Sequence, residues 1–156
     1  MEFKIRFAQS SDVEDIINLI QELADFEKEP DAVIINAEYL LQHGFGKNPA
    51  FRCFLAEDKN NNILGMALFY HRFSTWKGLT FHLEDLIVKQ QYRKLGIGKA
   101  LFEAFLNHAK EKKVNRAEWV VLDWNTNAIE FYKSYNAKIL DDWKTVQMDK
   151  ETIENL

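Results

Sequence analysis

The chain has few of the residues that build special structural classes. Its 156 residues include one cysteine, two prolines and six glycines. So little proline and glycine excludes collagen-like and low-complexity chains, and a hydrophobic content of 47% excludes a disordered one. The lone Cys53 has no partner for an internal disulfide or a thiolate metal cage. We therefore interpret Cys53 as a small buried apolar residue.

Long hydrophobic runs and an excess of positive charge are missing too. No apolar run approaches the roughly 20 residues that cross a bilayer, and the first four residues carry no apolar signal segment. These absences predict a cytoplasmic protein without membrane contact. Lys and Arg number 20 against 24 Asp and Glu, a net charge of −4, so no basic field attracts nucleic acid. The four histidines lack paired ligand spacing, and we expect no metal site.

Hydrophobic periodicity in the first 90 residues predicts an antiparallel sheet with two helices. Alternating apolar residues are typical of half-buried strands, and apolar residues at helical spacing indicate an amphipathic helix. Glycine at position 44 is expected to end the second helix in a left-handed conformation. The expected elements are a strand at 3–7, a helix that begins at a capping box in 11–14, a helix at 37–42, a hairpin of strands 51–57 and 63–70, and a strand at 79–88.

The pattern changes in the second half of the chain. A glycine-containing turn at 93–98 opens a helix, and a strand at 117–122 follows it. A strand, a helix and a second strand in this order indicate a βαβ unit with a parallel crossover. Residues 127–135 predict a further helix, and 138–148 one or two closing strands. With no repeat or linker, we expect one α+β domain over residues 1–156, with a mixed sheet.

The turn at 93–98 is a candidate anion site. Successive backbone N–H groups at the start of a helix attract a phosphate ester. A Walker loop would need Gly in place of Arg93 and Ser or Thr in place of Ala100, and a dinucleotide fingerprint would need Gly in place of Leu101. Both motifs fail. The remaining alternative is an ordinary strand-to-helix turn that uses glycine for its dihedral angles.

Four sequence blocks carry a resemblance to a known family. Arg-x-x-Gly-x-Gly at 93–98, between the strand segment 83–88 and the segments Trp124-Asn125 and 127–132, resembles the acetyl-coenzyme A site of the GNAT acetyltransferases. Within that superfamily the chain looks like the diamine (spermidine/spermine) and thialysine N-acetyltransferase branch. The clearest marks lie at 73–78, 83–86, 120–125 and 131–133, and the resemblance runs from about Ile5 to Met148.

The resemblance implies a GNAT-type fold, in which a strongly bent mixed sheet is flanked by helices and its fourth and fifth strands splay apart. Acetyl-CoA would lie in that gap, with its pyrophosphate on the loop. Family members usually have Gly where Lys94 stands, and lysine prefers a negative φ. Asn125 equally suits a helix N-cap. The implied cofactor-binding residues are Leu86, Ile87, Val88, Arg93, Lys94, Leu95, Gly96, Ile97, Gly98, Lys99, Asn125 and Tyr132.

The resemblance also implies two catalytic residues. Tyr132 matches the tyrosine that protonates the departing thiolate, and Glu84 matches the glutamate that removes a proton from the substrate amine. The alternatives are a tyrosine half packed in the core and a carboxylate on the surface at a strand end. Adjacent Glu84 and Asp85 point to opposite sides of a regular strand, so we expect a β-bulge there.

Six positions match the family's substrate-binding residues and would recognise a cationic amine through carboxylates and aromatic rings. The two tryptophans among them could instead pack in the core. Polyamine-acetylating members tend to have an acidic residue where Ser74 stands, which favours a small primary amine, either a thialysine-like amino acid or a diamine, over spermine. The implied substrate residues are Phe26, Glu27, Trp76, Glu84, Asp85 and Trp143.

The resemblance thus predicts an acetyl-CoA-dependent N-acetyltransferase that acts by direct transfer and forms a homodimer. Two alternatives stay open at this point. One is a non-catalytic module that senses acetyl-CoA, and the other is an enzyme that acetylates a protein N-terminus or lysine. Thiol release with small amines would separate the three.

Overall fold

The computed structural model describes residues 1–156, which divide into two compact units, Met1–Val120 and Val121–Leu156. Each unit is described by itself. The expectation of one domain over the whole chain stays a prediction.

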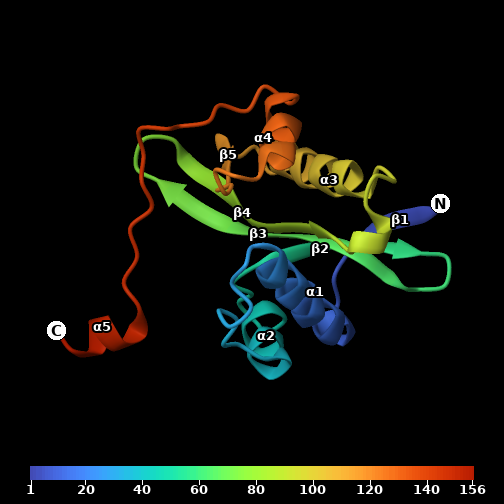
Figure 1. Ribbon diagram of the computed structural model, residues 1–156, viewed down its shortest axis with the longest axis horizontal. Helices are drawn as coiled ribbons and strands as arrows, with labels where there is room; N and C mark the ends of the chain where they lie inside the picture. The colour runs from blue at the N-terminus through green and yellow to red at the C-terminus, as the bar shows by residue number, and fades with distance from the viewer. The chain divides into compact units, whose positions relative to one another are not determined.

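The first unit contains a five-stranded mixed sheet in the order β1-β2-β3-β4-β5 (Figure 1). The first three pairings are antiparallel, and β4 pairs with β5 in parallel. The parallel pair is connected through α3, which confirms the predicted βαβ unit. The strands are β1 Phe3–Phe7, β2 Arg52–Asp58, β3 Ile63–Ser74, β4 Gly78–Val88 and β5 Arg116–Glu118.

Helices cover both faces of this sheet. Helices α1 and α2 lie on one face and α3 lies on the other (Figure 1). Adjacent side chains of β3 point to opposite faces of the sheet. Leu68 packs into the cluster that holds Ile16 and Leu19 of α1, while the ring of Phe69 contacts Phe105 of α3. The first part of β3, residues 63–69, is therefore buried on both faces. The helical segments of this unit are η1 Ser10–Asp12, α1 Val13–Phe26, α2 Ala37–Gly44, η2 Gln90–Tyr92 and α3 Ile97–Glu111.

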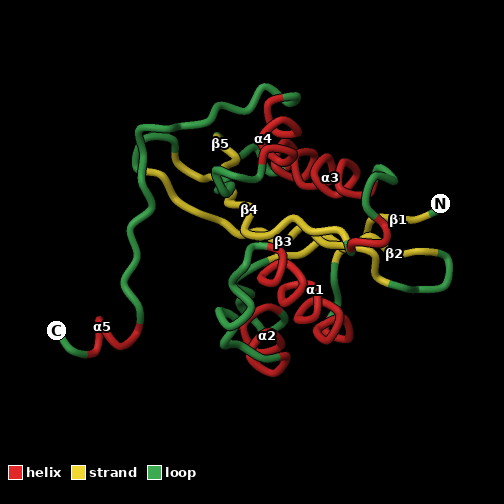
Figure 2. The backbone as a smooth tube through the Cα atoms, viewed as in Figure 1, coloured by secondary structure: helices red, strands yellow, loops and turns green.

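The second unit contains two short helices, α4 Thr126–Lys133 and α5 Lys150–Glu154, joined by a loop (Figure 2). The prediction of closing strands in 138–148 is wrong, since these residues form no strand. Their apolar side chains Leu140, Trp143 and Val146 are mostly exposed. A strand needs a neighbour to bond its backbone groups, and the sequence of a single segment cannot show whether one is present.

Three local predictions need correction. Helix α1 is preceded by the 3-10 turn η1, where Asp12 accepts from the Gln9 backbone N–H at 2.7 Å, so the capping box spans 9–12 and not 11–14. Gly44 lies inside α2 with no positive φ; its missing side chain instead makes room for the Phe51 ring, which a Cβ would meet at 2.2 Å. Strand β5 stops at Glu118 rather than Leu122.

None of the helices is both long and apolar enough to cross a membrane.

Candidate active site

The predicted β-bulge is present in β4 at Glu84. Leu68 of β3 lies opposite Asp85, and the next residue, Phe69, lies opposite Leu83. Glu84 is the extra residue, with no partner in β3. A bulge bends its strand and redirects side chains. It therefore gives the adjacent carboxylates Glu84 and Asp85 orientations that a regular strand would not allow.

Glu84 is held by two aromatic side chains of the same sheet. The Tyr70 hydroxyl donates a hydrogen bond to Glu84 Oε2 at 2.8 Å, and His82 Nε2 lies 3.6 Å from the same oxygen. The rings of Tyr70 and His82 stack with centroids 5.3 Å apart. Sequence reasoning missed both residues. Their cross-strand pairing in the β3–β4 hairpin was the available signal, because directly paired residues share a face.

Asp85 is the most perturbed carboxyl group of this site. Its pKa is raised to about 7, first by burial and then by the negative charges of Glu84 and Glu27. Glu27 caps the C-terminal end of α1, and burial raises the pKa of its carboxyl as well. The end of α1 and the bulge of β4 thus bring three carboxyl groups into one electrostatic cluster, which a bound cation would relieve.

The loop before α3 has an unusual backbone. Lys94 has φ of 64° and Gly96 has φ of 81°, so two residues in the left-handed region precede the helix. Lys94 thus adopts the conformation that the glycine of its family members would take, although lysine prefers a negative φ. Where the backbone alternates between right-handed and left-handed conformations, the N–H groups of successive residues can form a concavity that binds an anion. A Cβ at Gly96 would meet no atom within 4 Å, so the backbone there is open to a ligand.

Arg93 begins this loop and faces another predicted site residue. Its Nε donates to the Val88 carbonyl at 3.1 Å, and its guanidinium lies 4.9 Å from the centroid of the Phe26 ring. Arg93 therefore links the end of β4 to the end of α1, in contact with a ring that the sequence assigns to the substrate. Leu95 is half exposed and Ile97 is buried beneath the loop.

The strands β4 and β5 are paired over a short length. The parallel pairing joins only Thr80, Phe81 and His82 to β5. Beyond it, Leu86, Ile87 and Val88 continue β4 with no strand paired on that side. The unpaired edge leads to the loop at 93–98. Its backbone groups suit an amide-containing ligand, because such a ligand can satisfy them as a neighbouring strand would.

The second unit contains three of the predicted site residues. Asn125 caps α4, with its side-chain oxygen accepting from the Ala128 N–H at 3.3 Å, which confirms the N-cap interpretation; a cofactor role stays a prediction. Tyr132 is buried, and burial raises its pKa to about 12. Trp143 is 69% exposed and Trp76, in the first unit, is 80% exposed. Core packing is therefore the wrong interpretation of both tryptophans.

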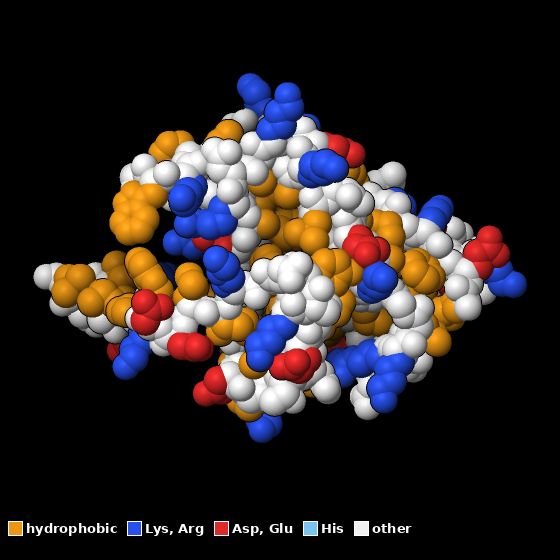
Figure 3. Space-filling model, turned by 90° about the horizontal axis from the view of Figure 1, so that it is seen from above, with side chains coloured by type: hydrophobic (Ala, Val, Ile, Leu, Met, Phe, Trp, Pro, Cys, Tyr) orange, Lys and Arg blue, Asp and Glu red, His pale blue; other side chains and the backbone are white.

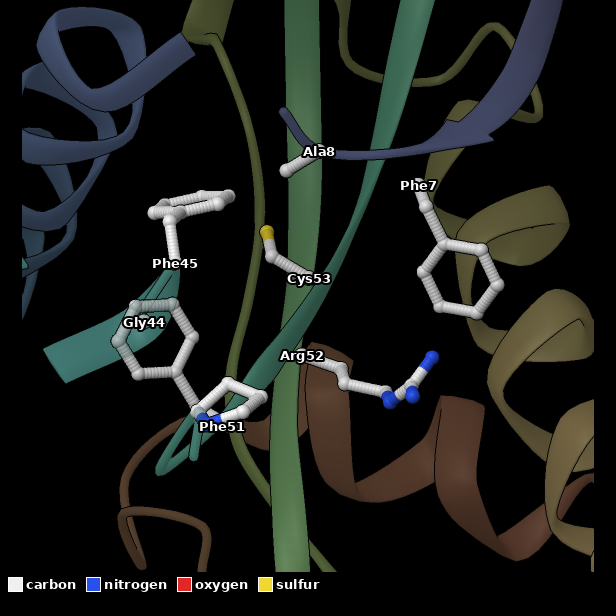
Figure 4. A pocket seen from close by; sticks show the side chains of 8 residues that line it. Phe7, Ala8, Gly44, Phe45, Phe51, Arg52 and Cys53 are labelled. Carbon is white, nitrogen blue, oxygen red and sulfur yellow. The ribbon is translucent and has the colours of Figure 1, made fainter. Parts of the chain in front are cut away.

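A separate pocket of about 170 Å³ lies beside Cys53 (Figure 4). Rings of Phe7, Phe45 and Phe51 and the Arg52 side chain surround it. Cys53 is 3% exposed, which confirms the prediction of a buried cysteine, and burial raises the pKa of its thiol. None of the predicted site residues lines this pocket.

The mixed sheet, the short parallel pairing of β4 with β5 and the loop before α3 agree with the GNAT-type fold that the sequence resembles. The sequence pattern of the Acetyltransferase (GNAT) family matches residues 13–136 of this chain. The chain belongs to the GNAT family of acetyltransferases and is an N-acetyltransferase.

Relatives of known function agree with that assignment. Thialysine N-epsilon-acetyltransferase of Sus scrofa is 35% identical, over 97% of this chain and 95% of its own. The enzyme of the same name from Caenorhabditis elegans is 36% identical, over 97% and 94%. Spermidine/spermine N(1)-acetyltransferase-like protein 1 of Homo sapiens is 33% identical over 97% of this chain, which matches 23% of that longer protein.

Solved structures support the fold alone. An integron cassette protein of V. cholerae superposes with a TM-score of 0.81, covering 99% of this chain and 97% of its own, at 21% identity. An aminoglycoside acetyltransferase from a soil metagenomic sample superposes with a TM-score of 0.74, over 93% and 97%, also at 21% identity. The predicted mixed-sheet GNAT fold is confirmed.

Proposed function

We propose that this protein transfers the acetyl group of acetyl-CoA directly to the primary amine of a small molecule, either a thialysine-like amino acid or a diamine. The observation that carries the proposal is the cluster of Glu27, Glu84 and Asp85 at the bulge in β4. The negative charges of Glu84 and Glu27 oppose the ionisation of Asp85, and a cationic guest would relieve that repulsion. An ammonium group supplies that charge and donates charge-assisted hydrogen bonds.

The proposed size of the substrate rests on other predicted substrate residues and on the relatives. The exposed ring of Trp76 is available to a cation or an aliphatic stem, whereas the half-exposed ring of Phe26 already packs against the Arg93 guanidinium. Ser74, where polyamine-acetylating relatives tend to have a carboxylate, offers no second charge. The relatives named thialysine N-epsilon-acetyltransferase share 35% and 36% identity with nearly the whole chain. Together these features favour one short amine over a long polycation.

The acetyl donor is proposed to bind along the unpaired edge of β4 and at the following loop. Backbone groups of Leu86, Ile87 and Val88 would bond its amide-containing arm, and the N–H groups of 94–99 would hold its pyrophosphate. The left-handed φ angles of Lys94 and Gly96 support that use, because left-handed residues are a feature of backbone segments that bind anions through their N–H groups. Bound there, acetyl-CoA supplies the acetyl group as a thioester.

Two side chains would move the protons. Glu84 accepts a proton from the substrate ammonium, so that the neutral amine can attack the acetyl carbonyl carbon; the new C–N bond replaces the C–S bond, and nitrogen then loses a second proton, which balances the proton that Tyr132 gives to sulfur. Tyr132 donates a proton to the departing sulfur. Burial raises the pKa of Tyr132 to about 12, which keeps its phenol protonated at neutral pH and therefore able to donate.

Thiol release from acetyl-CoA tests the proposal. The purified protein is assayed with thialysine, lysine, short diamines, spermidine, spermine and a lysine-containing peptide at equal concentration. We expect kcat/KM to be highest for thialysine or a short diamine. Release only with peptide would indicate a protein acetyltransferase, and binding of acetyl-CoA without release from any amine would indicate a sensor. Either result would contradict the proposed function.

A further inference from the structure

Glu84 belongs to a chain of polar side chains on one face of the sheet. Tyr70 and His82 lie directly opposite each other in the β3–β4 hairpin, and both contact Glu84 Oε2, at 2.8 and 3.6 Å. No contact of comparable length engages the other carboxylate oxygen, Oε1. One oxygen is therefore engaged by the sheet while the second is left for a ligand.

The other ring nitrogen of His82 connects this group of side chains to β5 through Glu118. His82 Nδ1 is buried without a hydrogen bond and lies 3.7 Å from Glu118 Oε1. Glu118 is in turn paired with Arg72 and, at 2.8 Å, with Arg116. His82 thus stands between two carboxylates, and the arginine-bound Glu118 limits how far its ring can turn. The stacked ring of Tyr70 limits it from the other side.

We propose that Tyr70 and His82 are positioning residues, which hold the Glu84 carboxylate by Oε2 so that Oε1 faces the incoming amine. This inference rests on the proposed function, in which Glu84 accepts the amine proton. The Glu84 side chain is 51% exposed on a bulge and would otherwise sample several rotamers. A general base must lie within hydrogen-bond reach of its proton in a fixed direction, so restricting those rotamers raises the productive fraction.

The Tyr70 hydroxyl is suited to donate its hydrogen bond to Glu84 over a wide pH range. Its pKa is raised to about 12, by burial first and then by its hydrogen bond to Glu84. The phenol therefore keeps its proton across the pH range in which an amine is acetylated. The hydroxyl does not itself reach the reacting atoms in this role, and its effect passes through Glu84.

Two ring-preserving variants test the inference. Tyr70→Phe removes the hydroxyl and keeps the stacked ring, and His82→Phe removes both nitrogens and keeps a ring against Tyr70. With thialysine and acetyl-CoA as probes, each variant is expected to lower kcat about five- to tenfold while KM for thialysine changes less than twofold. A variant with a merely structural role would instead lower Tm or raise KM.

The combination with Glu84→Gln separates positioning from an independent role. If Tyr70 acts through Glu84, adding Tyr70→Phe to Glu84→Gln lowers kcat no further, since residues that act as a unit are not additive. The matched control is Tyr39→Phe, because Tyr39 also packs on a histidine ring, His43, at 4.3 Å but contacts no carboxylate of the cluster. Tyr39→Phe should keep the wild-type kcat.

The outcomes also distinguish the inference from the function on which it rests. An active wild type with an impaired Glu84→Gln and an unaffected Tyr70→Phe overturns the inference alone. The inference is also overturned if Tyr70→Phe lowers kcat by the same factor in the wild type and in the Glu84→Gln variant. A Glu84→Gln variant with full kcat removes Glu84 as the base and the positioning role with it. A wild type that releases no thiol with any amine overturns the proposed function and the inference together.

Discussion

At the scale of single residues, Asp85 lowers the stability of the folded protein at neutral pH while it is proposed to bind the substrate amine. Its carboxyl group is half-buried near two other carboxylates, which raises its pKa to about 7 from an ordinary value of 3.8. Between those two values the folded state holds a proton that the unfolded state has released. Folding therefore loses stability as the pH rises from about 4 to about 7, and the loss persists at higher pH.

Replacing Asp85 by asparagine should increase stability and weaken substrate binding. Asp85→Asn is expected to raise the free energy of unfolding at pH 8 by at least about 1 kcal/mol, because no charge has to be buried. The same variant should raise KM for thialysine about tenfold, since a charge-assisted hydrogen bond to the ammonium is lost. Urea unfolding at pH 4 and pH 8 and steady-state kinetics measure both effects. Asp31→Asn, at an exposed position, is the control and should change neither.

Tyr132 is the second residue whose role can be tested alone. Tyr132→Phe should lower kcat tenfold or more, equivalent to about 1.4 kcal/mol in the barrier, because the departing sulfur loses its proton donor. Calorimetry should find the affinity for acetyl-CoA nearly unchanged. Tyr135→Phe changes a tyrosine of the same unit and should retain full turnover. Wild-type kcat in Tyr132→Phe would remove this phenol from the mechanism.

At the scale of elements, the loop before α3 stores backbone strain that glycine would relieve. Lys94 has φ of 64°, a conformation that costs a side-chain-bearing residue roughly 1–2 kcal/mol. Glycine would avoid that cost but lose about 0.5–1 kcal/mol to the greater freedom of the unfolded chain. Lys94→Gly is therefore expected to raise the free energy of unfolding by up to about 1 kcal/mol, measured by urea titration.

Lys89, which precedes this loop, provides a control whose expected change in unfolding free energy has the opposite sign. Lys89 has φ of −48°, which suits any residue, so Lys89→Gly should destabilise the protein through the unfolded state. A Lys94→Gly variant that is destabilised as much as Lys89→Gly would contradict the strain argument.

The packing of α3 on the sheet places His108 among aromatic rings. The imidazole stacks with Phe81 at 5.7 Å and meets Phe7, Phe54 and Phe69 edge-on at 5.3 to 5.8 Å. Burial, followed by the positive charges of Lys112 and Arg52, lowers the pKa of His108 below its ordinary value of 6.5, while nearby Glu111 opposes the shift.

This shift predicts an acid-dependent loss of stability. Below about pH 6.5 the unfolded state binds a proton that the folded state resists, so the free energy of unfolding falls as the pH falls. His108→Gln removes the titrating group, and the difference in unfolding free energy between pH 7.5 and pH 5 should therefore be smaller than in the wild type. Equal differences in the two proteins, from urea titrations, would exclude His108 as the source.

At the scale of the whole molecule, large apolar side chains reach the surface, and orange side chains appear among charged ones on the face drawn in Figure 3. At the end of the β3–β4 hairpin, Phe73 and Leu79 are cross-strand partners that are 69% and 53% exposed. Trp76 lies in the connecting turn. An apolar group of this kind is typical of an interaction surface.

We expect the protein to form a homodimer that buries this hairpin end. Sedimentation equilibrium should give twice the 18.4 kDa chain mass, and the double substitution Phe73→Ser with Leu79→Thr should shift the equilibrium toward monomer. Ile34→Ser, at a side chain that is 92% exposed outside the hairpin, should leave the dimer intact. A monomeric wild type at micromolar concentration would contradict the prediction.

Local patterns determined much of the fold. Alternation along 3–7 and the hairpin of 51–57 and 63–70 predicted β1, β2 and β3, because the side-chain period of a strand is visible in the sequence. The adjacent carboxylates at 84 and 85 predicted the bulge. The loop motif and its flanking blocks led to the GNAT family, which the comparisons confirmed. The prediction of closing strands in 138–148 was wrong, since the sequence of one segment does not show whether a pairing partner lies beside it.

What the sequence determined by itself was therefore the order of the main elements up to α4, the family and the candidate residues of the site, since each is encoded in neighbouring residues. Only the tertiary structure decided that Tyr70 and His82 contact Glu84, that Arg93 lies over Phe26 and that Asp85 titrates near pH 7. Those properties depend on burial and on distances between segments far apart in the chain. Such quantities arise only when packing brings the segments together.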